Sequence, residues 1–222
     1  ASFTVSDETI REAGELCRHL GTVLHVHVAE DRADVEDARR RGYRDPLERL
    51  MKLDGLVPGS ILAHGVHLEK QQVAAAEREG YWLVQNPRSN QGNRVGYPKA
   101  LWASRKVALG ADGYPSDMLA EEAELVRLAK TRGDVERKAS AWRLEGGLRL
   151  AGERFGVGLA PLSAGSTADL IVSHPGQAHP HHVIVGGRVV IKDRVLQTAD
   201  IEEIRAEARE EAGRLRERMQ EL

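Results

Sequence analysis

The sequence predicts an α/β protein built from parallel βαβ units, and three observations support that fold class. Apolar, strand-like segments alternate with helical segments over the first two-thirds of the chain, which is typical of parallel strands joined by helices. Polar residues follow the end of each of these strands. The pattern then changes to alternating strands. We therefore expect an α/β domain over residues 1–157 and a β-rich portion with a C-terminal helix over residues 158–222.

The helical segments are recognised by apolar spacing and by residues that begin or end helices. A first helix is expected to begin at Ser6 or Asp7 and to end at Gly21. A later one should carry Pro46 in its first turn, a position that suits proline. The further helical segments are 31–42, 45–55, 68–80, a long region from 115 to about 155, and an Arg- and Glu-rich helix over 201–222 whose charges we interpret as a solvated face.

The strand segments are rich in Val, Leu and Ile, as expected of a sheet buried on both faces. A second group of strands includes a hairpin around Gly186 and Gly187, because a Gly-Gly pair suits a two-residue turn. The expected parallel strands are TVLHVHV (22–28), SILAHGV (60–66), YWLVQNP (81–87) and KVALGAD (106–112), and the later strands lie within 165–175 and 181–196.

Composition excludes several classes of protein. The chain of 222 residues is 30% charged and 41% hydrophobic with a net charge of -2, so it has no basic footprint for nucleic acid. It contains no apolar run of membrane-spanning length and no basic-then-apolar signal segment. Cys17 is the only cysteine, which fits a reducing cytoplasm. We expect a cytoplasmic protein with no nucleic-acid or membrane partner.

The stretch VLHVHVAE (23–30) places His25 and His27 on one face of a strand. By itself it leaves open a metal-binding pair, a single ligand, or a half-buried strand with hydrogen-bonded histidines. Polar residues at the ends of parallel strands come together in such folds, and this recurrence favours a functional site. The residues at the predicted strand ends are His27 and Glu30, His64 and His67, Gln85 and Asn86, and Asp112.

A second group of histidines, His174, His179, His181 and His182, lies in a segment that contains Pro and Gly. No carboxylate or cysteine partner is evident in the sequence around them. We therefore favour a surface loop over a metal site for these histidines.

The motifs HVHVAE, LAHGVHL, QNPRSNQGNRVG and VALGADGYPSDM occur in an order that resembles the C-terminal half of the amidohydrolase superfamily. The similar branch contains cytosine, guanine, triazine and thioadenosine deaminases and chlorohydrolases, and the third and fourth motifs look most like the aminohydrolases called SsnA. GLAPLSAGSTADLIV resembles the family's return from barrel to β-sandwich. The resemblance implies strands five to eight of a TIM-type (β/α)8 barrel, part of a small β-sandwich and a C-terminal helix.

The resemblance also implies roles for individual residues. The family pattern His-x-x-Glu falls on His27, a metal ligand, and Glu30, a proton shuttle, so His25 lies one layer deeper. Asp112 would bind the metal and orient or deprotonate water, and His64 would polarise the nucleophile. The resemblance further implies one divalent metal ion, zinc in the first place and iron as the alternative, which suits imidazole and carboxylate and lowers the pKa of bound water.

The substrate contacts assigned to this chain are Gln85, where the family commonly has histidine, with Asn86, Arg88, Ser89, Asn90, His67 and Ser116. The expected activity is metal-dependent hydrolytic deamination, or dechlorination, of a nucleobase-like or triazine-like heterocycle. A non-catalytic fragment or structural subunit is the alternative, and a plain α/β binding domain without metal is the weakest reading.

The family's first-strand His-x-His pair and strands one to four have no counterpart in this sequence. His27 and Asp112 alone fall short of the three protein ligands usual for a catalytic zinc ion. Four strands of a barrel would also leave two unpaired edges. We therefore expect the missing half, or a second copy, to accompany the chain, and we expect the chain alone to be aggregation-prone or dimeric and inactive.

Overall fold

The structure is a computed structural model that describes residues 1–132, 139–156, 163–175 and 179–221. The chain divides into two compact units, residues 1–159 and residues 160–222. Within the described ranges, none of the helices combines the length and the apolar character needed to cross a membrane.

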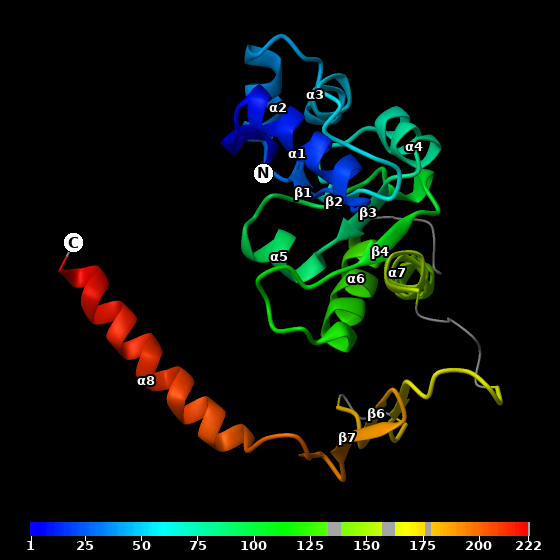
Figure 1. The fold of residues 1–222 in the computed structure, drawn as a ribbon, viewed down its shortest axis with the longest axis vertical. Coiled ribbons are helices and arrows are strands. Elements are labelled where there is room, and N and C mark those ends of the chain that lie inside the picture. The colour runs from blue at the N-terminus through cyan, green and yellow to red at the C-terminus, as the bar shows by residue number, and fades with distance from the viewer. Residues whose placement is uncertain (133–138, 157–162, 176–178, 222) are drawn as a thin grey trace. The chain divides into compact units, whose positions relative to one another are not determined.

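The first unit is built on a sheet of four parallel strands that pair in chain order (Figure 1). Helices connect the strands, as the alternation in the sequence predicts. The strands are β1 (His25–Val28), β2 (Ile61–His64), β3 (Trp82–Gln85) and β4 (Val107–Leu109). The helices are η1 (Ser2–Thr4), α1 (Asp7–Leu20), α2 (Arg32–Arg40), α3 (Pro46–Lys52), α4 (Lys70–Arg78), α5 (Pro87–Gly92), η2 (Leu101–Ala103), α6 (Met118–Arg132) and α7 (Ala139–Phe155).

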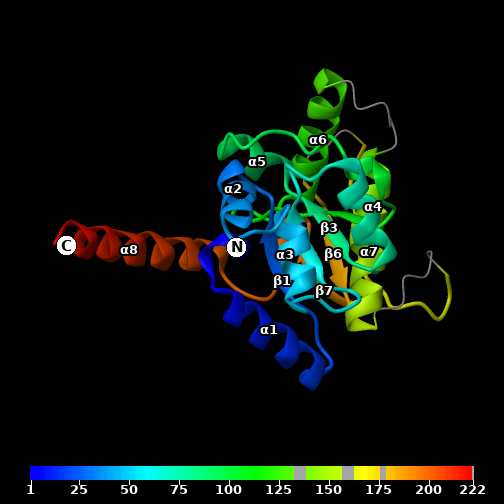
Figure 2. The same ribbon diagram turned by 90° about the horizontal axis from the view of Figure 1, so that it is seen from above.

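Capping residues define α1 as expected. The hydroxyl of Ser6 accepts a hydrogen bond from the backbone N–H of Thr9, and Gly21 ends the helix in the left-handed conformation at φ 62°. The long helical region expected from 115 to about 155 contains α6 and α7, and the residues between them lie outside the described ranges. In Figure 2, α1 and α5 lie on opposite sides of the β1–β4 strands.

The apolar core lies on one face of this sheet. Leu62, Leu83 and Val107 are buried there, together with Leu50 from α3 and Val73 from α4. The opposite face carries the register row of His27, Ala63, Val84 and Ala108. His25 and His27 are exposed on that face, so the expectation of a sheet buried on both faces is wrong at β1.

Helix α7 packs closely along β4. A Cβ atom added to Gly146 would lie 2.0 Å from the carbonyl oxygen of Val107, so only glycine allows this approach. The carboxylate of Glu153 accepts a hydrogen bond of 2.7 Å from the indole N–H of Trp82. These contacts attach α7 to the strands at the end of the first unit.

The second unit is an antiparallel sheet followed by one helix. Gly186 and Gly187 form the expected two-residue turn, at φ 56° and 80°. Asp193 and Arg194 form another turn, at φ 51° and 67°, which was not expected because neither residue is glycine. The elements are β5 (Leu170–Val172), β6 (His182–Val185), β7 (Arg188–Lys192), β8 (Val195–Leu196) and α8 (Ile201–Gln220).

Candidate active site

Four residues predicted to act together lie at the C-terminal ends of the parallel strands. The carboxylate oxygen Oε2 of Glu30 lies 3.8 Å from Nδ1 of His27 and 3.6 Å from Nε2 of His64. Nε2 of His64 also lies 3.9 Å from Oδ2 of Asp112. The rings of His27 and His64 meet edge to face with centroids 4.8 Å apart. Segments far apart in the sequence thus form one cluster.

The backbone at this cluster adopts conformations that are unfavourable for residues other than glycine. Ala29, His64 and Asp112 have φ values of 51°, 73° and 51°. Such residues cost energy and concentrate at functional sites. Each of them lies at or just after the end of a strand, where the cluster is built.

The imidazole of His64 is buried, and its two ring nitrogens have different surroundings. Nδ1 lies 2.8 Å from the amide oxygen of Asn90, which assigns the ring proton to Nδ1. Nε2 has no hydrogen-bond partner among the described residues, and it faces the carboxylates of Glu30 and Asp112. An unshared electron pair opposite two carboxylates requires a proton, a water or a cation between them.

The donor set fits a divalent metal ion. The ligand atoms of His27, Glu30 and His64 lie within 4.8 Å of one another. Oδ2 of Asp112 lies 3.9 Å from Nε2 of His64. Imidazole nitrogen and carboxylate oxygen are ligands that zinc and iron accept. His27 is 45% exposed, so its ring is accessible from the open face of β1.

One short segment orients three of these residues. The side chain of Asn93, which caps α5, donates a hydrogen bond of 3.1 Å to Oε1 of Glu30. The hydroxyl of Ser89 donates one of 2.5 Å to Asp112, and Asn90 contacts His64 as described. The sequence indicated substrate roles for Ser89 and Asn90 and did not single out Asn93. The sequence did contain a signal for Asn93, because it lies four residues after Ser89 and residues four apart on a helix share a face.

Ionisation at the cluster follows from these contacts. The hydroxyl of Ser89, followed by the nearby imidazoles of His64 and His27, holds the pKa of Asp112 below its ordinary value. Asp112 is therefore a carboxylate at neutral pH. Although His25 is exposed, partial desolvation of its ring, followed by the neighbouring His27, lowers its pKa. A neutral imidazole at position 25 adds no positive charge beneath the cluster.

Two further predicted residues are buried beside the cluster. Gln85 is fully buried, and neither of its amide atoms has a hydrogen-bond partner among the described residues. The amide nitrogen of Asn86 lies 3.4 Å from Nδ1 of His64, and its amide oxygen would be 2.4 Å from a Cβ at Gly110. An amide with unused donors and acceptors, such as Gln85, is suited to bind a polar heterocycle.

No contact with the four clustered side chains is recorded among the described residues for the remaining predicted substrate residues. The guanidinium of Arg88 donates a hydrogen bond of 2.7 Å to the buried carboxylate of Glu121 and another to the carbonyl of Pro115. Burial, followed by Arg32, lowers the pKa of His67. Ser116 is exposed. Substrate roles for Arg88, His67 and Ser116 stay predictions.

The second group of histidines has a carboxylate neighbour that the sequence did not reveal. Nε2 of His181 and Nε2 of His182 lie 3.7 and 3.8 Å from Oδ1 of Asp193, so the expectation that no carboxylate is near is wrong. The backbone N–H of Asp193 donates to Nδ1 of His182 at 3.2 Å. That bond keeps the ring proton on Nε2, towards the carboxylate, and disfavours metal binding by His182.

Comparison with known sequences finds similarity along nearly the whole chain. Residues 1–190 match the model of the family described as the amidohydrolase family. The chain is 29% identical to a 5-methylthioadenosine/S-adenosylhomocysteine deaminase of Syntrophomonas wolfei, over 97% of this chain and 57% of that protein. It is 28% identical to a 5'-deoxyadenosine deaminase of Methanopyrus kandleri, over 92% and 54%. The chain thus spans about half the length of these curated relatives.

Solved structures show the same relationship. An adenosine deaminase from Xanthomonas campestris with bound zinc is 26% identical, with a TM-score of 0.83 over 97% of this chain and 56% of that chain. A zinc complex of atrazine chlorohydrolase from Arthrobacter aurescens has a TM-score of 0.71 at 20% identity, over 91% and 51%, and supports the fold alone. These similarities confirm the expected fold class and resemblance.

Proposed function

The chain belongs to the amidohydrolase family, and from that premise we propose that it takes part in metal-dependent hydrolytic deamination of a small adenosine-type nucleoside. In this reaction water adds to the ring carbon that bears the amino group, the carbon–nitrogen bond breaks, and ammonia leaves. Relatives named as deaminases of 5-methylthioadenosine, S-adenosylhomocysteine and 5'-deoxyadenosine support the adenine-type ring. A cytoplasmic location, expected from the single Cys17, belongs to the same proposal.

One observation carries this proposal. Nε2 of His64, buried and without a hydrogen-bond partner among the described residues, faces two carboxylates that come from different strand ends. A reacting water or a cation could bind between Nε2 and these carboxylates, which are groups that can accept and donate protons. A purely structural histidine would have both of its ring nitrogens satisfied.

We assign the metal to His27 and Asp112, in agreement with the resemblance. A zinc ion there would supply Lewis-acid activation of water. Zinc in the related adenosine deaminase supports this choice, and iron is an equal fit to the donor atoms. The two assigned ligands are fewer than the usual three protein ligands of a catalytic zinc ion, so the proposal needs at least one further ligand.

Glu30 is proposed to move the protons. Asn93 holds one carboxylate oxygen, Oε1, and leaves Oε2 directed at the imidazoles of His64 and His27. Oε2 can accept a proton from water and deliver it to the ring nitrogen and then to departing ammonia. Ionised Asp112 orients the water, and Nε2 of His64 polarises it by accepting a hydrogen bond.

The test is Glu30→Gln in the enzyme with all barrel strands present, assayed for ammonia released from adenosine, 5'-deoxyadenosine and 5-methylthioadenosine. We expect turnover to fall by about 10²-fold or more while bound metal is unchanged. Glu12→Gln on exposed α1 makes the same chemical change away from the cluster and should have no effect. A loss of metal together with activity would make Glu30 a ligand. No ammonia from any of these nucleosides would reject the substrate class.

We further propose that residues 1–222 alone have no measurable deaminase activity, because only His27 and Asp112 are assigned as ligands and a catalytic zinc ion usually has three protein ligands. The same assay on the 222-residue chain, with zinc added, checks this point. Release of ammonia by the chain alone, abolished by Glu30→Gln, would show that the cluster is sufficient.

A further inference from the structure

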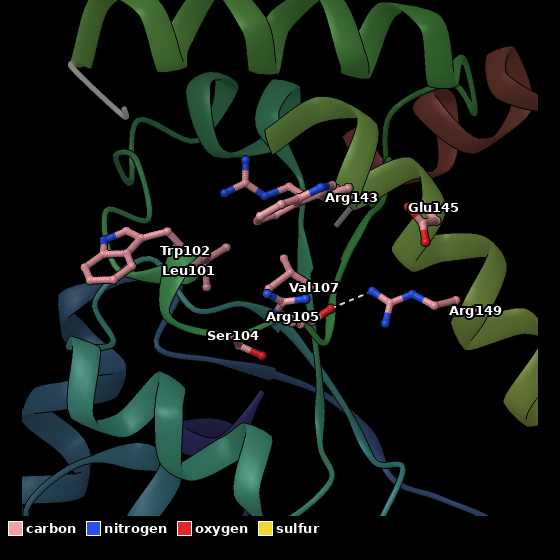
Figure 3. Close-up of a pocket in the computed structure, with 9 residues that line it drawn as sticks. Leu101, Trp102, Ser104, Arg105, Val107, Arg143, Glu145 and Arg149 are labelled. Carbon is pink, nitrogen blue, oxygen red and sulfur yellow. Dashed lines mark hydrogen bonds between the residues drawn. The ribbon is translucent and has the colours of Figure 1, made fainter. Parts of the chain in front are cut away.

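A second concave site lies at the opposite end of β4 from Asp112. It is a cavity of about 130 Å³ between η2, the start of β4 and α7. Figure 3 shows Trp102 at one side of the cavity and Arg149 at the other, with Arg105 and Arg143 between them. The cavity shares no residue with the candidate active site.

The cavity is strongly cationic. Among the described residues that line it are three guanidinium groups, those of Arg105, Arg143 and Arg149, and one carboxylate, that of Glu145. Arg143 is only 4% exposed. Like charges gathered around one cavity repel each other, and the repulsion is strongest where burial reduces screening by water. An anion bound beside Arg105 and Arg149 would reduce this cost.

Among the described residues, two of these arginines lack the carboxylate partner that some other arginines of the chain have. Arg49 and Arg88, for example, each form an ion pair with a carboxylate at 2.7 Å. In the described part of the chain, Arg105 and Arg149 form no ion pair. Arg149 donates through Nη2 to the carbonyl of Arg105 at 2.7 Å, and its Nε is buried with no hydrogen-bond partner among the described residues.

Aromatic rings support these guanidinium groups. Arg105 lies over the ring of Trp142 at 5.8 Å, and Arg149 lies over the ring of Trp82 at 5.4 Å. Such stacking fixes the plane of a guanidinium and leaves the N–H groups at its edge available to a ligand. Trp102 and Trp142 are also 46% and 43% exposed, which leaves indole surface at the mouth of the cavity.

We propose that this cavity binds the phosphate group of a small molecule, either free phosphate or a phosphate monoester. Three guanidinium groups and one carboxylate leave a charge of about +2, which complements a phosphate charge of about −1.5 to −2. The planar, forked guanidinium matches phosphate geometry. The volume equals that of about four waters at roughly 30 Å³ each, which is enough for one phosphate group. A flat ring on that phosphate would stack on the exposed indoles.

The tryptophans make the binding directly measurable. The chain contains three, Trp82, Trp102 and Trp142, and all of them line the cavity or support its arginines. Inorganic phosphate, phenyl phosphate and uncharged phenol are titrated into the 222-residue chain and followed by fluorescence and calorimetry.

Both phosphates should bind and phenol should not. Tighter binding of phenyl phosphate would identify a monoester as the ligand, and equal binding would identify free phosphate. No binding of either phosphate up to about 10 mM, or equal binding of phenol, would overturn the proposal.

Variants locate the site. Arg105→Gln and Arg149→Gln should each weaken phosphate binding by about tenfold, the usual effect of losing a hydrogen bond to a charged group. Arg78→Gln, an exposed arginine on α4 away from this cavity, makes the same change of charge and should leave affinity unaltered. Equal affinity in all three variants and the unmodified chain would place the ligand elsewhere.

Glu145→Gln provides a test that misfolding cannot imitate. The carboxylate of Glu145 repels an anion in the cavity, so its removal should strengthen phosphate binding about two- to fivefold. Weaker binding by this variant, with an unfolding transition like that of the unmodified chain, would contradict an anion site.

Discussion

The two units of the chain contain sheets of the same size, but only one of them has a buried core. Each sheet has four strands rich in Val, Leu and Ile. In the first unit Leu83 on β3 is fully buried, whereas in the second Ile171 on β5 is 72% exposed. No described residue of the second unit is buried. Apolar strands are therefore sufficient to predict a sheet, but a core also requires a second layer to cover it.

The first unit has such a layer because the helices that connect its strands pack against the sheet. Leu50 and Val73 come from the connecting helices α3 and α4 and join the core of β2 and β3. In the second unit the last strands are joined by two-residue turns, which are too short to contain a helix that could cover a face of the sheet. The exposed apolar side chains on its strands are Ile171, Val172, Val185, Val189 and Val195. A covering partner for this sheet stays a prediction.

The largest expected effect comes from the same truncation in the two sheets. Leu83→Ala removes buried side-chain volume and should lower the free energy of unfolding by about 2–5 kcal/mol. Ile171→Ala should change it by about 0.5 kcal/mol or less, because the side chain is already exposed. Urea denaturation followed by circular dichroism and tryptophan fluorescence measures both. A large loss for Ile171→Ala would show that a partner covers this strand in solution.

A smaller effect is expected at a pair of helical glycines. A Cβ added to Gly14 on α1 would lie 2.0 Å from the carbonyl oxygen of Asp54, while one added to Gly213 on α8 meets nothing within 4 Å. Gly14→Ala should therefore destabilise the first unit by about 1–3 kcal/mol, since the backbone must move.

Gly213→Ala should stabilise α8 by up to about 1 kcal/mol, the helix-propensity difference between alanine and glycine. Thermal unfolding and amide hydrogen exchange distinguish the two results. A destabilising Gly213→Ala would mean that α8 packs against another surface in solution.

The sequence allowed the local structure to be predicted where one residue determines it. Ser6 and Gly21 define the ends of α1 through their own hydrogen bonds and dihedral angles, and Gly186 with Gly187 defines a turn. The beginning of β1 was predicted three residues too early, at Thr22 instead of His25. Strand ends depend on where the neighbouring strand begins, and β2 begins at Ile61, the partner of His25.

The site was predictable as a cluster but not in its internal contacts. Strand ends and the family resemblance together predict one cluster, made of His27, Glu30, His64 and Asp112. The contact of Asn93 with Glu30 joins residues 63 positions apart through a side-chain direction that spacing alone does not determine. Asp193 was missed near the second group of histidines for the same reason, because a turn without glycine carries it there.

The smallest expected effect concerns an acidic residue at the start of a helix in each unit. Asp7 of α1 accepts hydrogen bonds from the distant Tyr43 and Arg49, at 2.8 and 2.9 Å. Asp200, the N-cap of α8, accepts hydrogen bonds from the backbone N–H groups of Glu202 and Glu203, and no bond to a distant side chain is recorded for it among the described residues. Burial would raise the pKa of Asp7, but the hydrogen bonds from Tyr43 and Arg49 outweigh it and hold the pKa below its ordinary value.

Tyr43→Phe should raise the pKa of Asp7 towards 3.8 and lower the free energy of unfolding by about 1 kcal/mol at neutral pH. Because the folded-state pKa of Asp7 is depressed, its contribution is complete above the unfolded-state value and is lost as pH falls through the folded-state pKa. The difference between variant and unmodified chain should therefore shrink as pH falls below 3.8. Urea denaturation at several pH values measures it, with Tyr81→Phe as a control that should cost the same at every pH. A pH-independent cost for Tyr43→Phe would show that the Asp7 carboxylate does not connect α1 to the rest of its unit.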